Sequence, residues 1–257
     1  LLVSFFLRRP RAASFAVLGP AQYHCGMNAL PNLILLHGSR GSTQELLPFA
    51  EQLLGACKPI LPNLLGHGGR PIPERFTVRE MALDILAQMD ENGLESTYLF
   101  GYSFGGYIAL YLAKHAPHRI RGVCTLATKF VFDPHTVDLF TRLSSVERIR
   151  NQQKDIMDQR HPGQNWDRLV SGLAELYRQL GQTPELAEGD LRGIRVPTLV
   201  ISANDDQLVP WPESLKLAYR MPRGQGFTFA GKAHPIDIIP VPFLASVIGD
   251  WLGCVAD

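Results

Sequence analysis

The chain has 257 residues, 46% hydrophobic and 19% charged, which suffices for a large core in one domain with an insertion or in two small domains. Its 25 basic and 24 acidic residues give a net charge of +1, so no basic surface for nucleic acid or for an anionic membrane is indicated. We therefore expect neither nucleic acid nor a membrane as a partner.

The N-terminal stretch LLVSFFLRRPRAASF places seven mostly apolar residues before Arg8 and Arg9. This run is too short to span a bilayer, and its charges follow the apolar residues, whereas those of a signal peptide precede them. The pattern predicts an edge strand. Because the sequence opens on Leu1 and not on methionine, its first residue need not be the native start.

Short apolar runs then alternate with longer helical patterns, which predicts an α/β fold with a mostly parallel, twisted central sheet and helices on both faces. Two predicted strands run into turns: NLILLHG at 32–38 ends in a His-Gly turn, and CKPILPNLLGHGG at 57–69 ends in a glycine-rich loop. The others are TYLF at 97–100, GVCTLAT at 122–128 and PTLVIS at 197–202. The predicted helices include TQELLPFAEQLLGA and residues 77–94. The second of these begins with a capping box, Thr77 followed by Glu80.

Residues 129–188 do not show the alternation of strand and helix patterns seen in the rest of the chain. Their charged segments have helical spacing and contain no strand-like run. We predict a small helical cap here, inserted between the two parts of the core, residues 1–128 and 189–257. The aromatic side chains of this segment either line an apolar pocket or pack within the cap; they are Phe130, Phe132, Phe140, Trp166 and Tyr177.

The segment GYSFGG, residues 101–106, places Ser103 between the predicted strand Thr97–Phe100 and a predicted helix that begins at Phe104. A sharp turn between strand and helix lifts a serine hydroxyl clear of the sheet, and glycines on either side avoid Cβ clashes. The backbone N–H of Phe104 is the natural first donor to an oxyanion beside that serine.

A nucleophilic serine needs a histidine to take its proton and an acid to orient the histidine. Of the eight histidines, only His234 follows a strand-like run near the C-terminus. Asp205 and Asp206 follow the predicted strand TLVIS, at a sheet edge where catalytic groups converge. The residues thus predict a Ser, Asp, His order and leave two candidates for the acid.

Five motifs together resemble the α/β-hydrolase superfamily over nearly the whole chain: LLHGSRGS, PNLLGHGGR, GYSFGG, ANDDQLVP and AGKAHPIDIIP. The resemblance implies that Ser103 is the nucleophile, that His234 is the base and, counting back from Val209-Pro210, that Asp206 is the acid. It also implies a second oxyanion donor, the N–H of Ser39. The expected partner is a small acyl substrate, and neither a cofactor nor a metal is required.

Three positions depart from the pattern of that superfamily. Ser39 stands where many relatives have a bulky apolar residue, Asn63 where aspartate is common and Ala203 where glycine is usual. We interpret Asn63 as structural. His37 and His67 are expected to shape the loops beside the site through hydrogen bonds to backbone. Nucleotide binding is disfavoured, because GSRGST lacks the lysine of a phosphate loop.

Four widely spaced cysteines form no C-x-x-C pair, so we expect free thiols in a reducing cytoplasm and no zinc site; they are Cys25, Cys57, Cys124 and Cys254.

The favoured function is a serine hydrolase acting on an ester, a thioester or a related acyl bond. A lyase or synthase with the same three residues is an alternative, because menaquinone-pathway members of the superfamily show similar Gly-Tyr-Ser-x-Gly-Gly and Gly-His-Gly-Gly patterns. A cap arginine facing the serine, with Arg142, Arg148 and Arg150 as candidates, would favour an anionic substrate.

A slow-turnover binding protein and a perhydrolase-like side activity are further alternatives. The oligomeric state stays open, a homodimer included.

Overall fold

A computed structural model describes residues 29–256 of the chain. The predicted N-terminal edge strand and Cys25 lie outside these residues. The structure has one six-stranded sheet in the order β2-β1-β3-β4-β5-β6, and every neighbouring pair is parallel. The strands are β1 Asn32–Leu36, β2 Lys58–Ile60, β3 Thr97–Tyr102, β4 Ile120–Leu126, β5 Thr198–Ala203 and β6 Gly224–Phe229.

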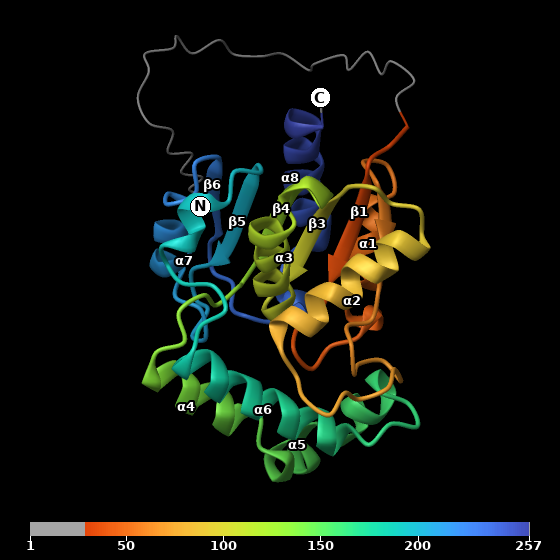
Figure 1. Ribbon diagram of the computed structural model, residues 1–257, viewed down its shortest axis with the longest axis vertical. Coiled ribbons are helices and arrows are strands. Elements are labelled where there is room, and N and C mark those ends of the chain that lie inside the picture. Colours follow the sequence, from red (N-terminus) through yellow and green to blue (C-terminus); the bar gives the residue numbers. More distant parts are fainter. Residues whose placement is uncertain (1–28, 257) are drawn as a thin grey trace.

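Helices cover both faces of this sheet (Figure 1). Helices α1 (Thr43–Leu53) and α8 (Val241–Val255) cover one face, and α2 (Val78–Glu91), α3 (Phe104–His115) and α7 (Trp211–Ala218) cover the other. Successive strand residues point to opposite faces, so the four inner strands β1, β3, β4 and β5 each contribute to two separate hydrophobic cores. The predicted parallel sheet with helices on both faces is confirmed.

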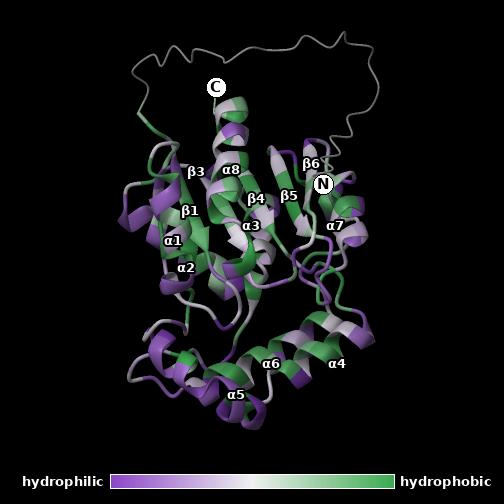
Figure 2. Cartoon of the chain, turned by 180° about the vertical axis from the view of Figure 1, so that it is seen from behind, coloured by the Kyte–Doolittle hydropathy of each residue, from purple (hydrophilic) through white to green (hydrophobic). Residues whose placement is uncertain are grey.

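Strand β1 illustrates this division. Ile34 and Leu36 belong to the core under α2 and α3, whereas Leu33 and Leu35 belong to the core under α1 and α8. A strand buried on both faces has no polar positions, which explains why β1 reads as a continuous apolar run. Figure 2 shows the same distribution, with mostly hydrophobic strands at the centre of the molecule.

Helix α2 begins where the capping pattern predicts. Its N-cap is Thr77, whose side-chain oxygen accepts a hydrogen bond of 3.0 Å from the backbone N–H of Glu80. This bond satisfies one of the amide groups that have no acceptor within the helix.

Three helices lie between β4 and β5: α4 (Pro134–Leu143), α5 (Val146–Arg160) and α6 (Trp166–Gln182). They lie across the carboxyl ends of the strands (Figure 1). Helix α6 buries one face with helical spacing, including Leu169, Leu173 and Leu176, in the core under α2 and α3. Helix α5 buries only Ile149 and Met157 and is mostly hydrophilic in Figure 2. The insertion thus packs on the sheet domain through α6.

Short 3₁₀ helices complete the chain: η1 Pro117–Arg119, η2 Asp190–Gly193 and η3 Ile236–Ile238. Within residues 29–256, no helix combines the length and the apolar character that crossing a bilayer requires.

Candidate active site

Ser103 alone forms the turn between β3, which ends at Tyr102, and α3, which begins at Phe104. Its φ and ψ angles are 51° and −117°, in a region that residues other than glycine rarely adopt. The backbone N–H of Ser103 donates a 2.8 Å hydrogen bond to the carbonyl of Leu126 in β4, which holds the turn at the sheet edge. Backbone strain of this kind occurs preferentially at functional sites.

The glycines around Ser103 allow α3 to lie against the sheet. A Cβ atom at Gly101 would lie closer than 3.0 Å to the backbone of Gly106, and one at Gly105 would lie equally close to the carbonyl of Leu36. Real Cβ atoms do not approach backbone so closely, so these positions accept only glycine without a shift of the helix.

A continuous hydrogen-bonded chain connects Ser103 to an acid through His234. Nε2 of His234 lies 3.1 Å from Oγ of Ser103, and Nδ1 lies 2.8 Å from Oδ2 of Asp206. Because a carboxylate can only accept, Nδ1 carries the hydrogen and Nε2 is free to accept the hydroxyl proton. The arrangement can therefore deprotonate Ser103 and stabilise the imidazolium that forms.

The two neighbouring carboxylates have different surroundings. The side chain of Asp206 is fully buried, and its Oδ1 accepts hydrogen bonds from the N–H groups of Leu208 (2.8 Å) and Val209 (2.9 Å). This leaves Oδ2 for His234. Asp205 is exposed, and its backbone N–H donates to the carbonyl of Lys232. The structure brings Asp206 to His234 and leaves Asp205 at the surface.

Of the two predicted oxyanion donors, Phe104 directly follows Ser103, and Ser39 lines the same cavity as Ser103. Phe104 is the first residue of α3, where an N–H group has no acceptor within the helix. Ser39 lies in the turn after β1, and both Ser39 and Ser103 line the same cavity.

Buried histidines fix the turn that contains Ser39. His37 donates from Nδ1 to the carbonyl of Gly38 (2.8 Å) and accepts at Nε2 from the N–H of Leu64 (3.1 Å). Nε2 of His67 lies 2.7 Å from the carbonyl oxygen of Ser39. Burial lowers the pKa of both imidazoles. These contacts confirm that both histidines shape the loops and bond to backbone.

Asn63 and the cysteines also behave as the sequence indicates. Oδ1 of Asn63 accepts a 2.8 Å hydrogen bond from the N–H of Thr43, the first residue of α1, which is a structural role. Cys57, Cys124 and Cys254 are free thiols.

Above Ser103 lies a cavity of about 490 Å³ between the sheet domain and the helices of the insertion. Phe140 of α4 and Tyr177 of α6 line it. The other three aromatic residues considered from the sequence do not: Phe130 and Phe132 pack in the core, and Trp166 packs against Ile149 and Met157. Of the two alternatives that the sequence left open, pocket lining thus holds for Phe140 and Tyr177 and packing for the other three.

The cavity also contains charged side chains that the sequence did not single out: Arg40, Glu45 and Arg160. Nη2 of Arg160 lies 3.1 Å from Oε1 of Glu45, whose side chain is 11% exposed. Oε2 of Glu45 accepts a 3.3 Å hydrogen bond from the N–H of Gly38. Burial raises the pKa of Glu45.

The three arginines considered from the sequence as candidates to face the serine do not do so. Arg142, Arg148 and Arg150 are exposed, and none of them lines the cavity. Arg160, at the end of α5, takes that place. Its position follows from how α5 packs on the turn after β1, which no local sequence pattern encodes. Arg40 could have been found from the sequence as a charged residue of the site, because it directly follows Ser39.

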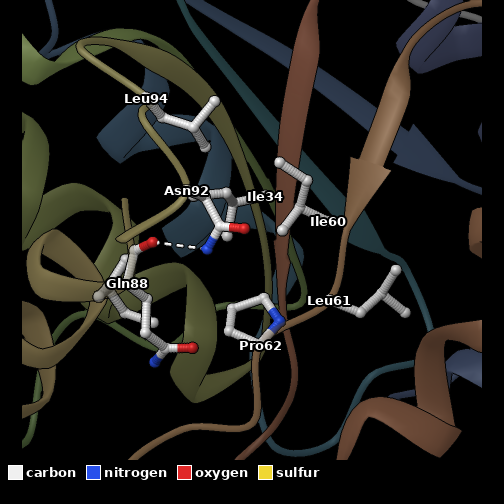
Figure 3. A pocket seen from close by; sticks show the side chains of 8 residues that line it. Ile34, Ile60, Leu61, Pro62, Gln88, Asn92 and Leu94 are labelled. Carbon is white, nitrogen blue, oxygen red and sulfur yellow. Dashed lines mark hydrogen bonds between the residues drawn. The ribbon is translucent and has the colours of Figure 1, made fainter. Parts of the chain in front are cut away.

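A second, smaller cavity of about 180 Å³ lies between β1, β2 and the end of α2 (Figure 3). Ile34, Ile60 and Pro62 line it together with Gln88 and Asn92, and Nδ2 of Asn92 donates to the carbonyl of Gln88 (2.7 Å). None of its lining side chains is titratable. Throughout the part of the chain that the structure describes, no cluster of three His, Cys, Asp or Glu side chains is arranged to hold a metal ion.

Residues 31–155 match a protein-family model described as alpha/beta hydrolase fold. The chain is 25% identical over 215 residues to a protein of Stutzerimonas stutzeri provisionally named carbamate hydrolase RutD, a match that covers 76% of this chain and 81% of that protein. It is 38% identical over 101 residues to the 2-succinyl-6-hydroxy-2,4-cyclohexadiene-1-carboxylate synthase of Yersinia enterocolitica, covering 39% and 35% of the two chains. A solved meta-cleavage product hydrolase of Pseudomonas fluorescens has a TM-score of 0.74 at 20% identity, covering 88% of this chain and 91% of that one. At this identity the structural likeness shows the fold.

Proposed function

The chain belongs to the α/β-hydrolase superfamily, and from this membership we propose that it is a serine hydrolase that cleaves an ester, a thioester or a related acyl bond. The observation that carries the proposal is the hydrogen-bonded chain from Asp206 through His234 to Ser103, with distances of 2.8 and 3.1 Å. A serine in an ordinary glycine-rich turn needs no such partners.

In the proposed mechanism, Nε2 of His234 takes the proton of Ser103 as Oγ attacks the acyl carbonyl. The N–H groups of Ser39 and Phe104 donate to the oxyanion that forms. The protonated His234 then gives its proton to the leaving alcohol, thiol or amine, which departs and leaves the acyl group on Ser103. Water, deprotonated by His234, releases the acid and restores the serine.

We propose that residues 129–188 act as a cap over this site, inserted in a core made of residues 1–128 and 189–257. Support comes from the cavity, whose walls include Phe140 of α4 and Tyr177 of α6 opposite Ser103. Closure of this kind excludes water from the reacting carbonyl and strengthens the electrostatic interactions around it.

The nature of the acyl bond is a separate question, because one fold supports several reactions. The relatives described above are named for a carbamate, a meta-cleavage product and a cyclohexadiene carboxylate. These names differ in the substrate they point to, so the substrate of this chain has to be found by experiment.

A lyase or synthase with the same residues is the second candidate. One observation favours it: two guanidinium groups, those of Arg40 and Arg160, line the cavity above Ser103. Cationic groups near a serine suit an anionic substrate, whereas a wholly apolar wall suits a neutral ester. Turnover of simple esters at ordinary enzyme rates supports the hydrolase, and activity confined to carbon–carbon bond cleavage or formation supports the alternative.

The experiment that tests the proposal is turnover of p-nitrophenyl hexanoate and of a small panel of thioesters and lactones. We expect the wild type to release p-nitrophenol and Ser103→Ala to lose this activity by roughly 10³-fold or more. Equal slow release by both proteins contradicts the proposal and favours a binding protein with the same fold.

A further inference from the structure

We propose that Arg40 recognises a carboxylate carried by the substrate of this site, which makes it a specificity-determining residue. The inference rests on the proposed function, because it names the substrate class of the same cavity. It is carried by a cation that lines the cavity, directly follows a proposed oxyanion donor and forms no ion pair with any carboxylate of residues 29–256.

The guanidinium of Arg40 is held in place by neutral groups alone. Nη1 donates hydrogen bonds of 3.2 Å to the carbonyl of Leu143 and to Oε1 of Gln153, both in the insertion. A guanidinium has five N–H donors, and these bonds use those of one nitrogen. Among residues 29–256, no carboxylate oxygen lies within 4.0 Å of Arg40. The remaining donors are available to a ligand in the cavity.

Charged groups of both signs lie near Arg40. Burial is the largest effect and lowers its pKa, Arg160 and Arg148 lower it further by repulsion, and Tyr177 and Glu45 raise it. Glu45 is the nearby buried acid, but its ion pair goes to Arg160. Asp237 also lines the cavity, and it is exposed to solvent, where water screens its charge. Among residues 29–256, Arg40 therefore has no carboxylate of its own, and Glu45 acts on it only from beyond ion-pair distance.

Keeping an unpaired guanidinium out of bulk water costs free energy unless a ligand compensates it. The planar fork of an arginine matches a carboxylate, to which it donates two parallel hydrogen bonds. A substrate with a carboxylate at a suitable distance from its acyl carbonyl would satisfy Arg40 while the carbonyl lies between Ser103 and the oxyanion donors. A neutral substrate of the same length would leave this charge unpaired.

The test compares matched esters that differ in one charge. The acyl pairs are mono-p-nitrophenyl adipate with p-nitrophenyl hexanoate, and mono-p-nitrophenyl suberate with p-nitrophenyl octanoate. A third pair, 4-acetoxybenzoate with its methyl ester, carries the charge in the leaving group. In at least one pair we expect kcat/KM of the wild type to favour the anion by roughly tenfold or more, as hydrogen bonds to charged groups typically do.

Arg40→Gln should bring this ratio to about one, mainly through KM, and Arg40→Lys should retain part of it because it keeps the charge but not the fork. Arg142→Gln is the matched control. It removes an exposed arginine of the insertion that pairs with Asp138, and it should keep the wild-type ratio. An absence of preference in all three pairs, or a preference that Arg40→Gln leaves intact, overturns the inference.

Calorimetric titration with adipate separates this inference from the proposed function. In a Ser103→Ala background, adipate should bind, and adding Arg40→Gln should weaken its binding by roughly tenfold. This result holds even if no ester is turned over, in which case the proposed function fails and the anion site stands. Equal adipate binding by the two proteins contradicts the role of Arg40, and turnover of neutral esters would then leave only the proposed function.

Discussion

Asp205 and Asp206 follow β5 side by side, yet only one of them contacts the histidine. The loop after the strand makes this selection: the N–H groups of Leu208 and Val209 bind one oxygen of Asp206 and aim the other at His234. The same hydrogen bonds hold the carboxylate in the orientation that the proposed mechanism requires.

Asp206→Asn should therefore lower kcat by about 10⁴-fold, because the asparagine amide no longer enforces the Nδ1–H tautomer of the imidazole of His234. Asp205→Asn changes an exposed side chain and should cost less than about tenfold. Steady-state kinetics of the two variants on p-nitrophenyl hexanoate shows which of the two carboxylates orients His234. A large loss in Asp205→Asn with near wild-type activity in Asp206→Asn would reverse the roles of the two acids.

How far the sequence predicts individual residues depends on how local their signals are. Ser103 follows from its glycines, and His234 and Asp206 from their place after strand-like runs and from the resemblance of their loops. Their role as a catalytic unit stays a prediction. Glu45 and Arg160 carry no local signal, because they meet only when the end of α5 packs on α1 and the turn before it. Contacts between distant segments of this kind need the structure.

At the scale of elements, the approach of α3 to β1 positions the serine. Gly105, in the first turn of α3, packs against the backbone carbonyls of Leu36 and His37. A helix that stood farther from the sheet would move Ser103 and the N–H of Phe104 away from the turn that holds Ser39. The glycine thus links packing to the geometry of the site.

Gly105→Ala should destabilise the protein by about 1–3 kcal/mol, since its Cβ meets backbone that cannot rotate away. Gly253→Ala in α8 is the matched control, because a Cβ there has nothing within 4 Å and alanine favours a helix by about 1 kcal/mol. Urea unfolding of both variants measures the difference. If Gly105→Ala were as stable as Gly253→Ala, α3 would not be in close contact with β1.

The end of α5 is joined to the glycine-rich loop after β2 by a buried histidine. Nδ1 of His161 accepts a 3.0 Å hydrogen bond from the N–H of Gly68, and burial lowers the pKa of His161 to about 4. A folded-state pKa below the unfolded value of about 6.5 means that the unfolded chain binds the proton more tightly. The stability from this group is complete above pH 6.5 and is lost as the pH falls toward 4.

His161→Asn keeps an acceptor for Gly68 but cannot titrate. Between pH 6.5 and 4, the free energy of unfolding of the variant should therefore fall less steeply than that of the wild type, by up to about 1.4 kcal/mol per pH unit. Urea unfolding at several pH values gives both slopes, and His118→Asn, at an exposed position, is the control. Parallel slopes for wild type and His161→Asn would show that this histidine does not titrate on unfolding.

At the scale of the whole molecule, the sequence predicted the α/β class because buried parallel strands leave continuous apolar runs. The order of the strands did not follow from the sequence, since β1, the first of the described strands, lies inside the sheet and β2, the second, lies at its edge. Helix α8 was also not singled out, because apolar residues on most of its turns obscure the helical period.

The helices between β4 and β5 contact the sheet domain close to the candidate site. Arg160 contacts Glu45, His161 contacts Gly68, and the side-chain amide of Gln164 donates to the carbonyl of Gly66 (2.8 Å). These contacts join the insertion to the first turn of α1 and to the loop after β2. If the insertion acts as the proposed cap, its position and that of the turn containing Ser39 are physically connected.

The most direct test of the central claim, that Ser103 is a nucleophile activated by His234, is labelling with a fluorophosphonate followed by peptide mass spectrometry. We expect a single modified serine, Ser103, in the wild type, and labelling slowed by orders of magnitude in His234→Ala, because an unactivated hydroxyl reacts poorly. Modification of Ser39 or Ser202 with Ser103 untouched, or labelling of Ser103 at the wild-type rate in His234→Ala, would contradict it.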